Sequence, residues 1–306
     1  MTLWGDSSAL WAFARGRQLE GTLSEGHEVG VWPITAMRVH YGWGFLPEEA
    51  WVIGAAPLWP PPPEPPGLDA IAKKTRLSRY RRVRTLDDCK RVLASHGPLV
   101  LASLEITDAW FTAPGGRIPA PSPTDKTVGY HCVALVGYNN ERAEFDFVNS
   151  WGMAWGEKAI GHISYELFQQ TCLELWTMDL QQRSNPPDGY MKGSWGVIEK
   201  NCGVGFHCRE FLGPGHQRIA WAFATERQDG DIEVEELFVQ PDFRRKGYGK
   251  ALVRQLGGLA DEGNIKLWVS YADSSPANLV VIEKLLKQLS IHLQPSPERW
   301  APIVAM

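Results

Sequence analysis

The stretch Val234-Glu-Glu-Leu-Phe-Val-Gln-Pro-Asp-Phe-Arg-Arg-Lys-Gly-Tyr-Gly-Lys-Ala-Leu252 changes its hydrophobic pattern partway along. Its apolar, β-favouring beginning predicts a strand that ends before Pro241, and its end predicts a helix from Gly249. Glycines and basic residues directly precede that helix. Such a turn suits a diphosphate, because the first N–H groups of a helix and the positive end of its dipole attract anions. The stretch therefore predicts a strand, a phosphate-binding turn and a helix.

Further elements of both kinds flank this stretch. Short β-favouring runs predict strands, and longer runs with a period near 3.6 predict helices. We expect strands at 205–211, 218–225, 232–239 and 265–271, a helix at 249–261 and a final helix at 277–289. This alternation predicts an α/β domain with a mixed sheet.

With the strand ELFVQP before it and the helix KALVRQL after it, Arg244–Gly249 resembles the R/Q-x-x-G-x-G/A acyl-CoA loop of the GCN5-related N-acetyltransferases (GNAT). The resemblance implies an acyl-CoA co-substrate, expected to be acetyl-CoA, and an amine-bearing small molecule or peptide as acceptor. It implies that the strand backbone lines the pantetheine arm and that amides of the turn bind the pyrophosphate. On this resemblance the cofactor-binding residues are Leu237, Phe238, Val239, Arg244, Arg245, Lys246, Gly247, Tyr248, Gly249, Lys250 and Asn278.

Acyl transfer to an amine needs a base for the ammonium proton and a donor for the departing thiolate. Glu235 and Glu236 are the candidate bases, on the strand expected beside the thioester. Strand alternation predicts that they face opposite sides, with Glu233 on the side of Glu235, so that only one can face the acceptor. The alternative is that both are surface carboxylates. The tyrosine usual for that family is not evident, and water or Ser274/Ser275 are the alternative proton donors.

A second set of motifs lies in the first part of the chain. It consists of Trp11-Ala-Phe13, Gly129-Tyr-His-Cys-Val-Ala-Leu-Val-Gly-Tyr138 and Asn149-Ser-Trp-Gly-Met-Ala-Trp-Gly-Glu157. From about residue 4 to residue 180 these motifs resemble, in order, those of papain-like cysteine peptidases. Because NSWGxxWGE is a highly specific motif, we expect an α+β papain-like domain followed by the α/β GNAT-type acyl-CoA-binding domain.

The resemblance implies that His131 is the catalytic histidine and that Asn149 orients it, as the third member of a catalytic triad does. The position of the nucleophilic cysteine, directly before the WAF motif, is occupied by Leu10. Leucine has no nucleophilic atom, so we expect peptidase activity to be absent. His131 and Asn149 are then expected to remain as a hydrogen-bonded pair under Trp151, or alternatively to hold a peptide-like ligand.

Three other residues near these motifs carry a nucleophilic atom. Ser7 and Ser8 lie upstream of Leu10, on the wrong helical face and with nothing to activate them. Cys132 neighbours His131 on a predicted strand, where adjacent side chains point to opposite faces. None of them is expected to replace the missing cysteine.

Composition and length bound the organisation of the chain. The 306 residues favour two domains, which we place at 1–182 and 191–306 around a polar, proline-containing linker at 183–190. The net charge of −4 argues against nucleic-acid binding, and no apolar run is long enough to span a membrane. Five cysteines without a CxxC pair suit a reducing, cytoplasmic location. No zinc-type spacing is present, so no metal is expected, and nothing in the sequence sets the oligomeric state.

One departure from the GNAT pattern suggests a link between the two domains. That family normally has a strand and two helices before its core, and those helices wall the acceptor cleft. Residues 191–204 are too few to form them. We hypothesise that the papain-like domain supplies the missing wall and helps to bind the acceptor, a peptide or an amino-acid-like amine.

The sequence thus predicts an acyl-CoA-dependent N-acyltransferase, with an acetyl group as the expected acyl group. A non-catalytic, peptide-binding or regulatory pseudoenzyme is the first alternative. A cysteine-peptidase-like hydrolase with an unorthodox nucleophile is the second.

Overall fold

The computed structural model of the chain describes residues 7–26, 28–51, 59–96, 100–180, 197–201, 206–213, 217–227, 230–261 and 267–269. Contacts between Cα atoms divide the chain into two compact units. Unit 1 combines Met1–Arg79 with Leu180–Glu298, and unit 2 is built mainly from Tyr80–Asp179. The N-terminal helices therefore pack with the C-terminal sheet. The division into domains 1–182 and 191–306 stays a prediction. Unit 1 contains residues from both sides of that boundary.

The helical part of unit 1 begins with α1 (Ala9–Glu20), for which Ser8 is the N-cap residue. The Ser8 side chain accepts the N–H of Trp11, and Gly21 ends the helix in the left-handed region at φ 76°. Three further helices follow: α2 (Pro33–Gly42), the 3-10 helix η1 (Glu48–Ala50) and α3 (Leu68–Ala72). They bury a shared core with α1, made of Leu10, Trp11, Ala14, Val39, Leu46, Trp51, Leu68 and Ala72.

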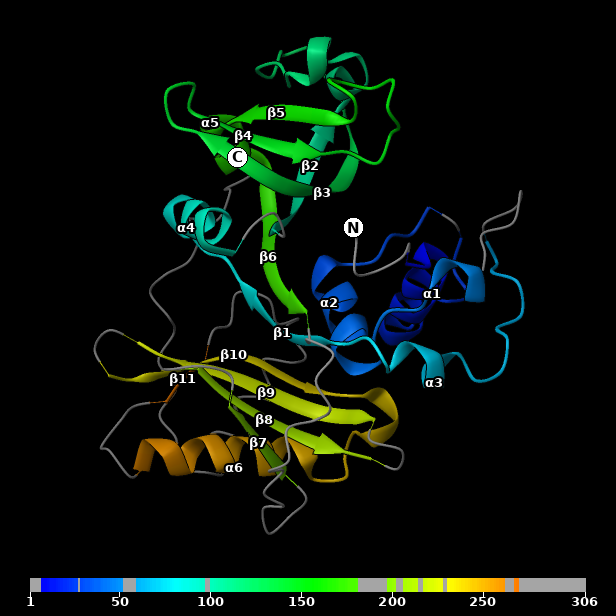
Figure 1. Ribbon diagram of the computed structural model, residues 1–306, viewed down its shortest axis with the longest axis vertical. Helices are drawn as coiled ribbons and strands as arrows, with labels where there is room; N and C mark the ends of the chain where they lie inside the picture. Colours follow the sequence, from blue (N-terminus) through cyan, green and yellow to red (C-terminus); the bar gives the residue numbers. More distant parts are fainter. Residues whose placement is uncertain are drawn as a thin grey trace. The chain divides into compact units, whose positions relative to one another are not determined.

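The sheet of unit 1 has the strand order β11-β10-β9-β8-β7. Its strands are β7 (Val197–Asn201), β8 (Phe206–Leu212), β9 (Arg218–Glu226), β10 (Ile232–Val239) and β11 (Leu267–Val269). Only the β10–β11 pair among them is parallel, so the sheet is mixed, as predicted. The helix α6 (Tyr248–Asp261) covers one face, where Leu252, Val253 and Leu256 pack against apolar strand residues (Figure 1).

Unit 2 contains an antiparallel sheet with the strand order β1-β6-β2-β3-β4-β5. Its strands are β1 (Leu77–Arg82), β2 (Val100–Thr107), β3 (Thr127–Asn139), β4 (Glu144–Val148), β5 (Ile160–Ser164) and β6 (Cys172–Leu180). The helices α4 (Leu86–His96) and α5 (Tyr165–Thr171) and the 3-10 helices η2 (Asp108–Thr112) and η3 (Pro114–Gly116) flank it (Figure 1). The core includes the fully buried Leu104, Leu135, Phe145, Phe147 and Phe168.

The C-terminal elements agree with the sequence where the structure describes them. The expected strand 232–239 is β10, and the expected helix 249–261 is α6 with one residue added at its start. The strand β7 was not predicted. The expected helix 277–289 lies outside the described residues. Among the helices that the structure describes, none is long and apolar enough to cross a lipid bilayer.

Candidate functional site

The face of the unit 1 sheet opposite α6 is covered by the helix α2. Trp221 and Phe223 of β9 are almost completely buried there, and the Tyr41 ring of α2 lies 5.1 Å and 5.0 Å from their ring centroids. Gly42 permits this close approach, because a Cβ added to it would lie 3.0 Å from the Trp221 Cη2 atom. The helix α2 is thus packed directly on the C-terminal sheet.

A buried polar network ties α2 to the same sheet. The Tyr41 hydroxyl donates to Glu210 Oε2 at 2.8 Å, and Arg218 Nε lies 2.8 Å from the same oxygen. Arg218 Nη1 also donates to the carbonyl groups of Tyr41 and Leu77, each at 2.9 Å. Burial raises the pKa of Tyr41 well above its ordinary value, so its hydroxyl stays protonated and keeps donating. The buried Glu210 carboxylate is therefore compensated by the Tyr41 hydroxyl and the Arg218 guanidinium.

The strand β10 carries a β-bulge where the candidate bases lie. Glu233 pairs with Thr225 and Glu236 with Phe223, and the register shifts between Val234 and Glu236. The Thr225 hydroxyl donates to Glu235 Oε1 at 3.0 Å. Because cross-strand partners share a face, all three carboxylates turn to the face that α2 covers. The predicted opposition of Glu235 and Glu236 is wrong, because the extra bulge residue interrupts the alternation.

Glu236 is held by a residue of α2. Arg38 Nη2 and Nε lie 2.9 Å and 3.2 Å from Glu236 Oε1. The Arg38 guanidinium also lies 4.9 Å from the ring centroid of Phe238, which in turn packs against Trp221. Sequence reasoning missed Arg38, because no local pattern links residues 198 positions apart.

The expected phosphate-binding turn joins β10 to α6. A 3-10 turn at Pro241–Phe243 leads into it, and Arg244 Nε donates to the Val239 carbonyl at 3.1 Å. Arg245 and Gly247 have positive φ angles of 63° and 90°. These two left-handed residues turn the backbone sharply between the extended Arg244 and the start of α6, so basic residues directly precede a helix N-terminus, where the dipole favours anions.

The side chains of this turn divide into exposed and packed ones. Arg244, Arg245 and Lys246 are exposed, as is the backbone of Gly247. Tyr248 instead packs its ring against Phe211, with centroids 5.0 Å apart. The sequence-predicted cofactor residues from Leu237 to Lys250 therefore lie along one continuous strand–turn–helix segment, whereas Asn278 lies outside the described residues.

In unit 2, His131 of β3 and Asn149 after β4 form a pair. His131 Nε2 lies 2.8 Å from Asn149 Oδ1, which also accepts the Ser150 N–H at 2.8 Å. The Trp151 ring stacks on the imidazole with a centroid distance of 4.8 Å. This is the hydrogen-bonded pair under Trp151 that the sequence predicted. Since the amide oxygen only accepts, the proton of a neutral His131 is on Nε2.

The N-terminus of α1, where the family resemblance places the nucleophile, carries Ser8 as the N-cap and Leu10 in the first turn. Leu10 is buried among the core residues of the N-terminal helices. The Ser8 hydroxyl is fully buried, where it accepts the Trp11 N–H at 3.2 Å and donates to the Trp51 carbonyl at 2.8 Å. Ser8 therefore has a structural role as a helix cap.

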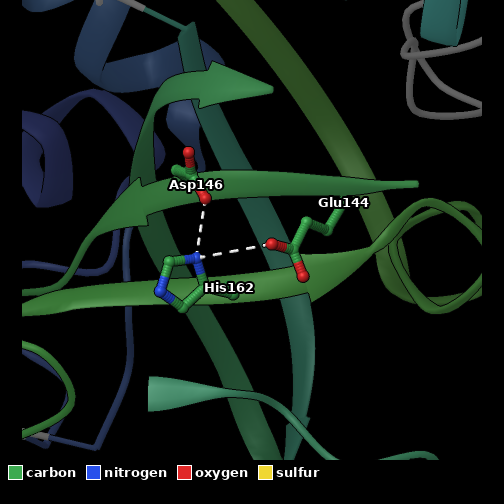
Figure 2. A group of neighbouring side chains, drawn as sticks. All are labelled: Glu144, Asp146 and His162. Carbon is green, nitrogen blue, oxygen red and sulfur yellow. Dashed lines mark hydrogen bonds and ion pairs between the residues drawn. The ribbon is translucent and has the colours of Figure 1, made fainter. Parts of the chain in front are cut away.

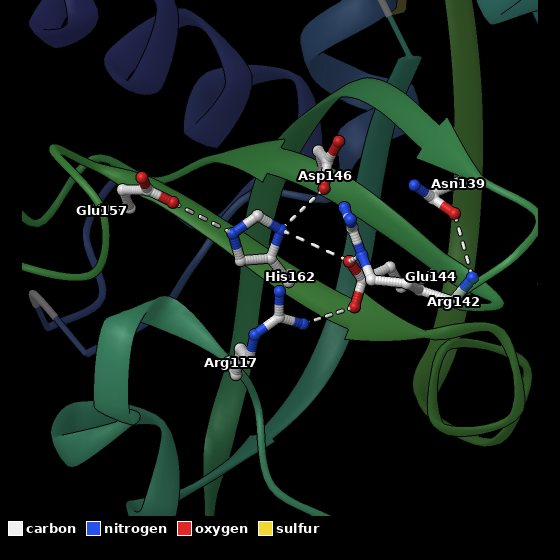
Figure 3. Close-up of polar contacts among 7 residues, drawn as sticks. All are labelled: Arg117, Asn139, Arg142, Glu144, Asp146, Glu157 and His162. Atoms are coloured by element: carbon white, nitrogen blue, oxygen red, sulfur yellow. Dashed lines mark hydrogen bonds and ion pairs between the residues drawn. The ribbon is translucent and has the colours of Figure 1, made fainter.

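Glu144, Asp146 and His162 form a charged cluster that sequence spacing did not reveal, and Figure 2 shows their side chains converging between β4 and β5. Their ligand-type atoms lie within 4.8 Å of one another, and His162 Nδ1 is 2.6 Å from Asp146 Oδ1. Figure 3 shows that Arg117 and Arg142 both reach Glu144. These ion pairs lower the pKa of Glu144 against the opposing effect of its burial. Two guanidinium groups already neutralise the carboxylate that a cation would need.

Comparisons with known proteins identify two families along the chain. Residues 69–173 match the model of the papain family of cysteine proteases, and residues 194–283 match that of the acetyltransferase (GNAT) family. The chain is 26% identical over 168 residues to an uncharacterized peptidase C1-like protein of Acanthamoeba polyphaga mimivirus, covering 52% of this chain and 53% of that protein. It therefore spans about half the length of that relative.

Among solved structures, the chain is similar to xylellain, a cysteine protease from Xylella fastidiosa. The TM-score is 0.53 at 26% sequence identity, and the match covers 58% of this chain and 71% of xylellain. The matched range of the papain model begins at residue 69, so the assignment of Leu10 to the nucleophile position stays a prediction. The chain thus has a papain-like α+β fold in its N-terminal part, followed by a GNAT domain that supports acyltransferase activity.

Proposed function

We propose that the chain is an N-acyltransferase that uses acyl-CoA, with acetyl-CoA as the expected donor, and that it acts in the cytoplasm. The observation that carries the proposal is the segment from the bulged strand β10 to the exposed turn before α6. It lies within the residues that match the GNAT family. GNAT domains typically take acyl-CoA and an amine acceptor.

The turn before α6 would hold the pyrophosphate of the donor. Its left-handed residues Arg245 and Gly247 turn the backbone sharply before α6, and the first turn of α6 adds N–H groups that lack helical partners. The exposed Arg244, Arg245 and Lys246 add positive charge around the turn. The backbone of Leu237–Val239 would then line the pantetheine arm.

The chemistry requires two proton transfers. One proton of the acceptor ammonium passes to a base, and we assign Glu236, with Glu235 as the alternative. The free amine then attacks the thioester carbonyl, a C–N bond forms and the C–S bond breaks. The second proton on nitrogen goes to the departing CoA thiolate, which leaves as the thiol. The bulge brings Glu235 and Glu236 to one face, so both can approach the acceptor.

The papain-like part has two roles in this proposal. Its helix α2 packs on the GNAT sheet and supplies the acceptor wall that the short segment before β8 does not provide. It has no peptidase activity, because Leu10 stands where the cysteine is expected and the Ser8 hydroxyl is engaged by Trp11 and Trp51. The His131–Asn149 pair is then an inherited arrangement that keeps its geometry without a nucleophile.

Calorimetric titration with acetyl-CoA tests this function. We expect micromolar binding by the wild-type protein and at least about a 10-fold loss in a Gly249→Glu variant, since the added carboxylate repels the pyrophosphate. Gly30→Glu is the matched control, because Gly30 is exposed and a Cβ there meets no atom within 4 Å. Absence of binding in the wild-type protein would contradict the proposal and favour a peptide-binding scaffold.

A further inference from the structure

The Arg38–Glu236 pair sets a positive and a negative charge side by side on the face that α2 covers. The side chain of Glu236 is 5% exposed and that of Arg38 is 28% exposed. The guanidinium lies over the Phe238 ring, so its plane is supported on an aromatic surface. The pair therefore combines a fixed carboxylate with a cation that solutes can reach.

Docking of α2 does not explain this second ion pair. The contact between α2 and the sheet already has a fully desolvated anchor in Tyr41, Glu210 and Arg218, in which the Arg218 side chain is only 5% exposed. Arg38 differs in being partly open to solvent. It contacts Glu236, the carboxylate that is proposed to take the proton of the acceptor ammonium.

We infer that the acceptor is an amino-acid-like zwitterion, whose carboxylate binds Arg38 while its ammonium binds Glu236. This inference rests on the proposed transferase function and names the substrate class of that site. The planar fork of an arginine matches a carboxylate through two parallel hydrogen bonds. A neighbouring ammonium group on the same ligand is complementary to Glu236, so the four charges alternate in sign.

The exchange of partners also prepares the reaction. In the structure Glu236 Oε1 accepts from both Arg38 Nε and Arg38 Nη2. When the acceptor carboxylate takes over the guanidinium, Oε1 becomes available to the acceptor ammonium and receives its proton. Arg38 is then a specificity-determining residue. An amine without a carboxylate leaves the Arg38–Glu236 ion pair intact, so that Glu236 is less available to the ammonium.

The test compares two substrate mixtures with acetyl-CoA and the full chain. One mixture holds the proteinogenic L-amino acids and the other the corresponding L-amino acid amides, with CoA release and product masses as readouts. We expect the wild-type protein to use the amino acids at least about 10-fold better, as fits one charge-assisted contact. Arg38→Gln should remove this preference through a higher KM for amino acids and faster turnover of the amides, since a guanidinium no longer holds Glu236 Oε1. Arg38→Lys should restore part of the preference.

Arg91→Gln on α4 is the matched control, since the Arg91 side chain is 76% exposed and pairs only locally with Asp88 within the described residues. Binding of acetyl-CoA by each variant shows that the donor site is intact. If acetyl-CoA binds but the wild-type protein uses both mixtures equally, or neither, the inference is wrong while the donor site stands. An equal loss of both substrates in Arg38→Gln would make Arg38 a positioning residue for Glu236 alone. Failure of acetyl-CoA to bind would overturn the proposed function itself.

Discussion

The covered sheet face of unit 1 and the His131–Asn149 pair of unit 2 are two sites in opposite conditions. The pair has a short hydrogen bond of 2.8 Å and a stacked tryptophan, but the sequence places Leu10 where its nucleophile is expected. The sheet face has titratable groups in abundance, since a bulge turns Glu235 and Glu236 to the same side. One site has a positioned histidine–asparagine pair whose nucleophile is predicted to be missing, and the other has candidate reacting groups, of which Glu236 contacts the helix α2.

Packing alone can hold two side chains in a catalytic-type arrangement, whether or not they take part in a reaction. His131 and Asn149 are held by strand pairing, the Trp151 ring and the Ser150 N–H, none of which needs a nucleophile. On the sheet face, the Arg38–Glu236 contact gives the helix α2 a place in the proposed chemistry. Function must therefore be argued from groups that can react.

The two sites should differ most in how far their residues contribute to the rate of acyl transfer. Glu236→Gln should lower kcat about 10²–10⁴-fold, because the amide keeps an oxygen for Arg38 but accepts no proton. His131→Gln should change transfer by less than about 2-fold. Thiol release from acetyl-CoA in the presence of an amine measures both. If Glu235→Gln abolishes transfer and Glu236→Gln does not, Glu235 is the base.

A stability comparison follows from the buried network of unit 1. Arg218→Met leaves Glu210 charged and buried, and we expect a loss of about 3–5 kcal/mol in the free energy of unfolding. Arg142→Gln in unit 2 removes a cation whose side chain is 52% exposed, and Arg117 remains on Glu144, so the loss should be far smaller than that of Arg218→Met. Denaturant unfolding followed by tryptophan fluorescence measures both losses. Equal losses would show that the α2 network is no stronger than a surface ion pair.

The stability of unit 1 should depend on pH through His40. Burial lowers the pKa of the half-buried His40 from 6.5 to about 4, against the opposite effect of its hydrogen bond to the Gly44 carbonyl. Between these values the unfolded chain binds a proton that the folded chain does not, so stability falls as the pH falls from 6.5 toward 4. We expect a loss of about 1–2 kcal/mol from pH 7 to pH 5, with the lower figure favoured by the partial exposure of the ring. His40→Gln should reduce this slope, and an unchanged slope would assign it to other groups.

Much of the C-terminal fold could be predicted from local pattern. The β10–turn–α6 segment follows from hydrophobic period, proline and glycine over one contiguous stretch. The bulge could not be predicted in this way, because one inserted residue changes the facing of Glu235 and Glu236 without changing composition.

The contacts between α2 and the sheet of unit 1 could not be predicted from local pattern. Arg38 and Glu236 are 198 positions apart, and Tyr41 and Glu210 are 169 apart. The hypothesis that the papain-like part supplies a wall rests on the small number of residues before β8. That number does not indicate which helix would form the wall. In unit 2 the motif around Asn149 identified its partner His131, because the family resemblance included both positions.

The smallest expected effect compares a helix cap in each unit. The Ser8 hydroxyl is buried and makes two hydrogen bonds, one to the Trp11 N–H and one to the Trp51 carbonyl. Thr85 caps α4 at the surface, where its hydroxyl accepts the Asp88 N–H at 3.0 Å. Ser8→Ala should cost about 1–2 kcal/mol of unfolding free energy and Thr85→Ala about 0.5–1, because only the buried cap leaves a carbonyl without water. Ser8→Thr should retain most of the stability, because it keeps a hydroxyl at the cap. An unchanged stability of Ser8→Ala would show that the hydroxyl does not stabilise the helix.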